Sequence, residues 1–283
     1  MTGSSDKTLK IAILGCGYMG TALLDGWLQR SKHTFTAHVK SQASHDRLQQ
    51  SVSTHSDRVT VSHGDDKTAQ AAKDADIILL GILPGELSAF LKTPGLVQEL
   101  KGKVVVSMLA GVPTSQLQQE LASQSSGEDW KVARIIPTIG SRIGESVTLV
   151  ADPEALPEHF KLIDEAFSSI GSVQHVPEAQ MDAATAIGAA VHALAIVATD
   201  SVTDASVASG VPRATAQALT AACLKSAGAL FNQGGMTPES MKAAMSTPSG
   251  ITLNALVSLD STVRAGIASA TRGAIDYARS MND

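Results

Sequence analysis

The stretch 10-KIAILGCGYMG-20 decides the fold of the first half of this chain. An apolar run is followed at once by Gly15, Gly17 and Gly20, in the spacing G-x-G-x-x-G. This spacing predicts a buried strand, a tight turn and a helix whose N-terminus faces the diphosphate of a dinucleotide. Gly15 permits the turn, Gly17 lets the backbone approach the diphosphate, and Gly20 packs the helix on the strand. The predicted cofactor loop also contains Cys16, Tyr18 and Met19. A glycine-rich turn without a ligand is the alternative interpretation.

Seven further strand candidates follow the first one, and helical stretches separate several of them. Several are almost wholly apolar, as is typical of strands buried on both faces of a parallel sheet. They are FTAHV (35–39), VTVS (59–62), DIILLGI (76–82), KVVVSML (103–109), KVARII (131–136), VTLVA (147–151) and SVQHV (172–176). The alternation predicts an α/β fold, with a Rossmann-like, doubly wound domain over residues 1–176.

The remaining residues, 177–283, contain no strand pattern and predict an all-helical domain. Helices are expected over 178–209, 212–232, 238–246 and 252–281, separated by the turn signals SGVPR, QGGMTP and TPSG. These helices are rich in Ala, Ser and Gly, which allows close packing. Long apolar faces on so small a domain suggest that it is covered by a partner subunit.

Composition excludes several classes of protein. The chain has 283 residues, of which 43% are hydrophobic and 17% charged, with a net charge of −5. Nucleic acid is therefore not an expected partner, because its phosphates require clustered Lys and Arg. No apolar segment approaches the ~20 residues that span a bilayer, so no membrane partner is expected. We expect a cytoplasmic protein without a disulfide framework, and no cluster has the spacing of metal ligands.

The end of the second predicted strand selects the cofactor. An enzyme that binds NAD usually has Asp or Glu there, bonded to the ribose 2′-hydroxyl. This chain has Lys40 and Ser41 instead, with Arg47 further along, and these side chains suit a 2′-phosphate. NADPH is therefore expected, with NADH as the other candidate. A simply solvated Lys40 is the alternative interpretation.

The order of motifs along nearly the whole chain resembles the pyrroline-5-carboxylate reductase family. After the glycine loop, the matching segments are ADIILLGILPGEL (75–87), KVVVSMLAGVPTSQLQQEL (103–121), ARIIPTIGSRIGESVTLV (133–150), MDAATAIGAAVHAL (181–194), ASGVPRATAQALTAACLKSAGALF (208–231) and MSTPSGITLNALVSLD (245–260). The resemblance implies a helical dimerisation domain and an active site at the subunit interface. It implies transfer of hydride from NAD(P)H to the C=N carbon of a cyclic imino acid. It also implies further cofactor contacts at Gly81, Ile82, Leu83, Pro84, Ala110 and Gly111.

The resemblance assigns the substrate to the loop in MSTPSGITLNAL (245–256). The turn precedes a predicted helix, whose N–H groups attract a carboxylate, and Thr252 is placed to bond the imine nitrogen or a proton-supplying water. A simple helix cap at Thr247 or Thr252 is the other interpretation. The predicted substrate contacts are Val191, Thr247, Ser249, Gly250, Ile251 and Thr252.

The chain departs from the family at residues 188–194, where Gly-Ala-Ala-Val-His-Ala-Leu replaces Ser-Gly-Ser-Gly-Pro-Ala-Tyr. His192 is either a proton donor in the pocket or a hydrogen-bonded histidine of the core or interface. Thr138-Ile139-Gly140 replaces Asn-Thr-Pro, and Leu83 replaces a Lys. These changes leave three functions open: proline synthesis from pyrroline-5-carboxylate, reduction of another cyclic imine in a specialised pathway, or a non-catalytic NADP(H)-binding regulatory dimer. A homodimer, or a larger assembly of dimers, is expected.

Overall fold

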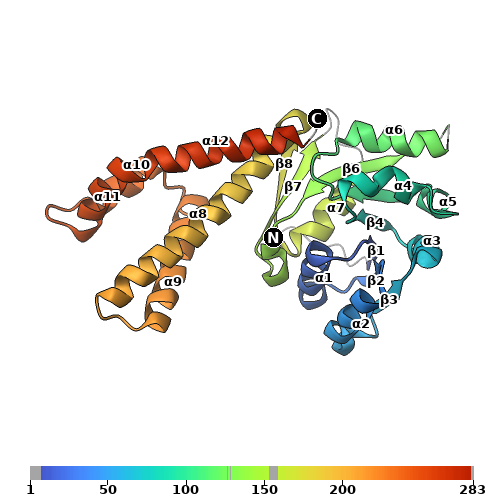
Figure 1. The fold of residues 1–283 in the computed structure, drawn as a ribbon, viewed down its shortest axis with the longest axis horizontal. Coiled ribbons are helices and arrows are strands. Elements are labelled where there is room, and N and C mark those ends of the chain that lie inside the picture. Colours follow the sequence, from blue (N-terminus) through green and yellow to red (C-terminus); the bar gives the residue numbers. More distant parts are fainter. Residues whose placement is uncertain (1–7, 126, 128, 153–158, 282–283) are drawn as a thin grey trace. The chain divides into compact units, whose positions relative to one another are not determined.

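The computed structural model describes residues 8–125, 127, 129–152 and 159–281. It contains two compact units, Met1–Thr185 with Ala278–Asp283, and Ala186–Tyr277. Figure 1 shows strands only in the first of them. This agrees with the predicted fold class, a Rossmann-like α/β domain followed by an all-helical domain.

The first unit is built on an eight-stranded sheet of order β3-β2-β1-β4-β5-β6-β7-β8. All neighbouring strands are parallel except β6 and β7, which are antiparallel. All eight predicted strands are confirmed within one or a few residues at each end. They are β1 (Lys10–Leu14), β2 (Thr34–Val39), β3 (Val59–His63), β4 (Ile77–Leu80), β5 (Val104–Ser107), β6 (Lys131–Ile136), β7 (Ser146–Asp152) and β8 (Gly171–Pro177).

Helices cover both faces of this sheet. The α-helices of the first unit are α1 (Tyr18–Arg30), α2 (Gln42–Ser51), α3 (Thr68–Ala72), α4 (Leu87–Leu91), α5 (Leu96–Leu100), α6 (Thr114–Gln124) and α7 (His159–Ser168). The 3-10 helices are η1 (Ser53–His55), η2 (Asp65–Lys67), η3 (Pro84–Glu86), η4 (Ile139–Ile143) and η5 (Glu178–Gln180). Side chains of β1 alternate between two apolar clusters: Ile11 and Ile13 join α1 and α7, whereas Ala12 and Leu14 join α3 to α6.

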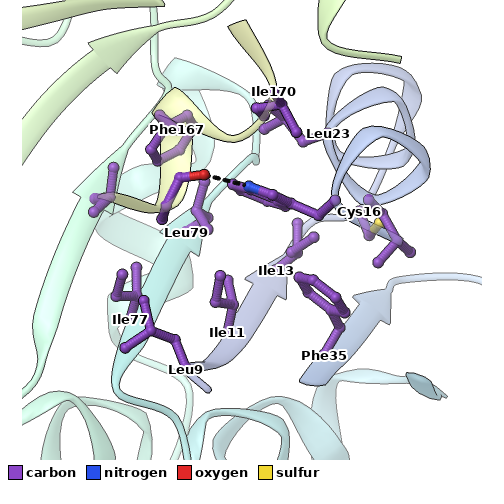
Figure 2. Close-up of a cluster of buried hydrophobic side chains, with 14 of the residues drawn as sticks. Leu9, Ile11, Ile13, Cys16, Leu23, Phe35, Ile77, Leu79, Phe167 and Ile170 are labelled. Atoms are coloured by element: carbon purple, nitrogen blue, oxygen red, sulfur yellow. Dashed lines mark hydrogen bonds between the residues drawn. The ribbon is translucent and has the colours of Figure 1, made fainter. Parts of the chain in front are cut away.

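Trp27 is a fully buried member of the first cluster, to which Phe35 and Phe167, labelled in Figure 2, also belong. Its ring stacks on Phe35, with centroids 5.8 Å apart, and meets the edge of Phe167 at 5.1 Å. The indole Nε1–H donates to the carbonyl oxygen of Ala166 at 2.7 Å, so its polar atom is satisfied inside the core. These contacts fix α1, and therefore the glycine loop before it, against the sheet and α7.

A buried arginine joins the sheet to the segment that follows it. Arg134 on β6 is almost fully buried, and its two terminal nitrogens each lie 2.8 Å from a carboxylate, those of Glu178 and Asp182. Thr114 donates its hydroxyl to Glu178 at 2.7 Å. Because a buried charge is stabilised only when it is paired, this cluster fixes η5 and the first turn of α8 to β6.

The helices of the second part are α8 (Met181–Ala208), α9 (Arg213–Asn232), α10 (Pro238–Met245), α11 (Ile251–Thr262) and α12 (Arg264–Ser280). One prediction was wrong: the single helix expected over 252–281 is two helices, interrupted at Val263. The break follows Thr262, so two β-branched residues, which are poor in helix interiors, meet there. Pro212 precedes α9 as its N-cap, whereas Pro238 is the first residue of α10.

Large apolar side chains are exposed on these helices, among them Ile187, Val191, Ile196 and Val197 of α8. The expectation that no apolar segment approaches bilayer length was wrong for Glu178–Ala208, whose 31 residues are long and apolar enough by composition. The segment was not recognised from the sequence because Ala, Thr and Gly are spread between its larger apolar residues, so it contains no long uninterrupted apolar run. Unpartnered apolar faces of this kind are also typical of a subunit interface.

Candidate functional site

A cavity of about 760 Å³ lies in the first unit, where the loops after β1, β2 and β4 meet. The carboxyl ends of parallel strands are where ligands bind in open α/β sheets. The cavity is lined by eight of the residues predicted to contact the cofactor: Gly15, Cys16, Gly17, Tyr18, Lys40, Gly81, Ile82 and Leu83. The predicted nucleotide loop therefore opens onto this cavity.

The three glycines differ in what surrounds them. Gly15 has φ +85°, and a Cβ added to it would lie 2.8 Å from the carbonyl carbon of Gly81. A Cβ on Gly20 would lie 3.0 Å from Ile13 Cγ2 on β1. A Cβ on Gly17 would meet only the carbonyl oxygen of Gly15, at 4.0 Å. The protein therefore needs Gly15 for its turn and Gly20 for packing, whereas the space at Gly17 is left for something else.

The glycine loop is held by the main chain of β2. The N–H groups of Gly15 and Cys16 donate to the carbonyl oxygen of His38, at 3.0 and 2.8 Å. The His38 ring is buried, with Nδ1 2.9 Å from Ser62 Oγ and Nε2 3.0 Å from Thr68 Oγ1. Burial lowers the pKa of His38 below its ordinary value of 6.5. A neutral, hydrogen-bonded imidazole thus fixes the strand end that carries the loop.

The thiol inside the loop is not a reactive group. Cys16 is buried, and burial raises the pKa of its thiol to about 12. Because the thiolate is the reactive form, Cys16 remains a packing residue at neutral pH.

A basic corner lies where β2 ends. Lys40, Ser44 and Arg47 line the cavity there, and Arg47 donates to Ser44 Oγ at 3.2 Å. The Lys40 ammonium lies 3.7 Å from Glu86, and both side chains are largely exposed. Such a pair contributes little to stability, so Lys40 remains free to exchange Glu86 for an anion.

Six predicted cofactor residues do not line the cavity: Met19, Gly20, Ser41, Pro84, Ala110 and Gly111. Gly20 faces β1 instead, and the Ser41 side chain accepts a hydrogen bond from Ser44 N–H as the N-cap of α2. Sequence reasoning also missed other residues that line the cavity, among them His38, Asp65, Thr68 and Arg142. His38 precedes a strand end, a position that signals a site in parallel sheets, but Arg142 lies far away in sequence.

The second predicted site, residues 247–252, forms a tight turn before α11. Gly250 is the N-cap, and its N–H donates to the carbonyl oxygen of Thr247 at 2.8 Å. A Cβ at Gly250 would lie 2.5 Å from Thr247 Oγ1, and Ser249 has φ +60°. No side chain caps α11, so the interpretation of Thr247 or Thr252 as a simple cap was wrong. Helical Thr252 lies one residue inside α11, and Thr247 Oγ1 faces Gly250 Cα rather than an N–H.

The remaining predicted substrate residues lie on exposed or half-buried surface of their own unit. Ile251 and Val191 are exposed, and Thr252 is half-buried. His192 on α8 is exposed, and its Nδ1 lies 2.7 Å from the carbonyl oxygen of Gly188. Because a carbonyl only accepts, Nδ1 is the donor in this contact, which leaves Nε2 as the acceptor of the neutral ring. Among the residues that the structure describes, no group of three His, Cys, Asp or Glu side chains is arranged to hold a metal ion.

Known families match both parts of the chain. Residues 178–281 match the family model described as pyrroline-5-carboxylate reductase dimerisation, and residues 10–111 match the model described as NADP oxidoreductase, coenzyme F420-dependent. A pyrroline-5-carboxylate reductase of Lophium arboricola is 32% identical, with 96% of this chain and 93% of the relative covered. A pyrroline-5-carboxylate reductase of Schizosaccharomyces pombe is also 32% identical, over 93% of this chain and 96% of that protein.

A solved structure has the same fold. The crystal structure of Plasmodium falciparum pyrroline carboxylate reductase, described with NADP bound, superposes with a TM-score of 0.79 at 20% identity. It covers 97% of this chain and 98% of the other. At that identity the likeness bears on the fold alone, but the two curated relatives extend over nearly all of both sequences. The chain therefore belongs to the pyrroline-5-carboxylate reductase family.

Proposed function

We propose that this protein reduces the C=N bond of 1-pyrroline-5-carboxylate to give proline, with NADPH as the reductant. The observation that carries the proposal is the 32% identity to proteins of that name along nearly the whole chain. When bound, the cofactor supplies a hydride to the imine carbon. The protein must then hold the two reactants together, supply a proton to the nitrogen and limit water.

The residues of the first unit fit a dinucleotide. The space at Gly17 is a cradle that a Cβ would fill, beside the N-terminus of the 13-residue helix α1. Backbone N–H groups at such a terminus bind phosphate, and no side chain caps this one. Gly15 and Gly17, whose N–H groups donate within the protein, would leave room for the diphosphate, and the N–H of Tyr18 at the start of α1 would bind it. Gly81, Ile82 and Leu83 would hold the part of the cofactor that extends past β4.

The basic corner favours NADPH over NADH. The cavity residues at the end of β2 include Lys40, Ser44 and Arg47, and none of the residues 39–42 is acidic. A 2′-phosphate placed there gains charge-assisted hydrogen bonds from both cations. An enzyme selective for NADH would instead present a carboxylate to the 2′-hydroxyl.

The turn before α11 is proposed to bind the substrate carboxylate. Its 12-residue helix begins without a capping side chain, so the first-turn N–H groups remain available to an anion. Thr252 lies in that turn and would bond the imine nitrogen or a water that protonates it. His192 is the second candidate for proton supply, since its Nε2 can take up a proton and pass it on, and Val191 would contact the ring.

The second unit is proposed to form a homodimer through its exposed apolar helices, because residues 178–281 match a dimerisation model. Larger assemblies of dimers and a cytoplasmic location stay predictions. No nucleic-acid partner is proposed, since the net charge is −5.

The proposal is tested by adding pyrroline-5-carboxylate to the protein and NADPH and measuring the loss of NADPH absorbance over time. Turnover with proline as product supports it. Turnover only with another imine from a panel of cyclic imines would move the protein to a specialised pathway, an alternative that the altered segment 188–194 favours. Binding of NADPH with no oxidation by any imine would identify a non-catalytic regulatory dimer.

A further inference from the structure

Arg142 is a cavity residue that the glycine motif does not account for. It lies on η4, after β6, more than a hundred residues from the loop that it faces. The side chain is 44% exposed, so it is neither buried in the core nor freely solvated. Its placement depends on how η4 packs.

The segment that carries Arg142 is fixed to α1 on both sides of it. On one side, Gly26 of α1 touches the carbonyl group of Ser141 so closely that a Cβ there would overlap it. On the other side, Arg30 donates through Nη2 to the carbonyl oxygen of Ile143 at 2.6 Å. Because the residues before and after Arg142 are both held by α1, its Cα has little freedom relative to that helix.

The guanidinium then lies along α1 toward its N-terminus. Arg142 Nε is 3.1 Å from Asp25 Oδ2, and its Cζ is 5.9 Å from the ring centroid of Tyr18. Tyr18 and Asp25 are seven residues apart, which places them on one face of the helix, two turns from each other. Tyr18 is the first residue of α1, and both Tyr18 and Arg142 line the cavity. The cation is thus held over the helix end where a diphosphate would bind.

The N–H groups on Nη1 and Nη2 of Arg142 are available to a ligand. Within the part of the chain that the structure describes, its ion pair is made through Nε, and Nη1 and Nη2 have no hydrogen-bond partner. An arginine held by one carboxylate and one aromatic face is oriented before any ligand arrives, so less entropy is lost on binding. Planar guanidinium groups match phosphate oxygens in geometry as well as charge.

We propose that Arg142 is a cofactor-binding residue that donates through Nη1 and Nη2 to the diphosphate of the dinucleotide, with Tyr18 as its stacking surface and Asp25 as its orienting carboxylate. This inference rests on the dinucleotide site of the proposed function. It adds a side-chain cation to a loop that otherwise offers the diphosphate only backbone N–H groups.

The test measures dissociation constants of NADPH and NADH, from cofactor fluorescence, for the full-length protein. Arg142→Met should weaken both cofactors by about tenfold, because the diphosphate is common to both. Arg142→Lys should recover part of the loss, since it restores charge but not the fork of donors. Arg47→Met is the matched control: it removes the cavity cation of α2, which follows β2, and should weaken NADPH alone. Equal dissociation constants for wild type and Arg142→Met would overturn the proposal.

Two further measurements separate the competing explanations. In an Asp25→Asn background the effect of Arg142→Met should shrink, because the arginine is no longer oriented; full additivity would exclude the positioning role of Asp25. If Arg142→Met raised the KM for the imino acid and left cofactor binding unchanged, Arg142 would belong to the substrate, and the proposal would be wrong. A wild type that binds NADPH without turnover would contradict the proposed function while leaving this inference testable by binding.

Discussion

Gly15 and Gly81 approach each other so closely that neither can carry a side chain: a Cβ on Gly15 would lie 2.8 Å from Gly81 carbonyl carbon, and one on Gly81 would lie 2.7 Å from Gly15 oxygen. The loops after β1 and β4 are therefore in direct contact and together line one side of the cavity. Gly15→Ala adds this overlap to a left-handed φ of +85°. We expect it to lower the free energy of unfolding by about 2 kcal/mol or more, measured by urea denaturation. An unchanged midpoint would show that the two loops separate easily.

Gly17→Ala should behave in the opposite way. The added methyl group meets nothing nearer than 4.0 Å in the protein, so the urea midpoint should fall by less than in Gly15→Ala, by an amount set only by the backbone of Gly17, whose ψ of −145° suits glycine. The methyl group projects into space reserved for the cofactor, and the dissociation constant of NADPH should rise about tenfold or more. The pair of variants separates a glycine needed by the fold from one needed by the ligand. Tight binding by Gly17→Ala would place the diphosphate elsewhere.

Lys40→Ala should weaken NADPH about fivefold and leave NADH almost unchanged. The reason is that the Lys40 ammonium, now 3.7 Å from Glu86, is proposed to contact only the 2′-phosphate. Titration of both cofactors at low and high salt checks this, because a solvent-exposed charge contact weakens as salt increases. Equal losses for the two cofactors would remove the 2′-phosphate role.

Thr252→Val should reduce kcat/KM for pyrroline-5-carboxylate by about tenfold to a hundredfold, while NADPH still binds. Valine keeps the shape of threonine and removes its hydroxyl. Thr262→Val is a suitable control, because Thr262 lies at the other end of α11, where its hydroxyl donates to Ser258 oxygen at 2.9 Å. Unchanged steady-state kinetics in Thr252→Val would transfer proton supply to His192 or to a water held by other groups.

Stability should fall as the solution is acidified from about pH 7.5 to about pH 5.5. Burial lowers the pKa of His33, His38 and His159 below the ordinary value of 6.5. Below pH 6.5 these histidines are protonated in the unfolded chain but stay neutral in the folded chain, because their folded pKa values are lower. Protonation therefore stabilises the unfolded state, and the stability present above pH 6.5 is lost as the pH falls toward the folded pKa values. Thermal melting across this range measures the slope, and His38→Gln should flatten it. A slope that His38→Gln leaves unchanged would assign the effect to other groups.

The sequence predicted the sheet well because each strand is marked locally. Ile11 to Leu14 is an unbroken apolar run, and the structure agrees with the turn predicted at Gly15 and the packing predicted at Gly20, whereas the role of Gly17 stays a prediction. The sequence did not predict Arg142, since no local pattern reports that Gly26 and Ser141 touch. It also did not predict that Ser41, a candidate cofactor contact at the end of β2, caps the next helix, α2. Such choices depend on tertiary packing rather than on residue type.

The Arg134 cluster has a consequence for dissecting this protein into its parts. The turn at Pro177, where the last strand ends, is a tempting place to truncate the gene if the nucleotide-binding part is wanted alone. A protein ending there would lose Glu178 and Asp182 and leave the Arg134 guanidinium buried without a counter-charge, a defect that typically costs about 3–5 kcal/mol. Retaining the first turn of α8, through Thr185, keeps both carboxylates. The smallest fragment that folds is therefore expected to end inside a helix rather than in the loop before it.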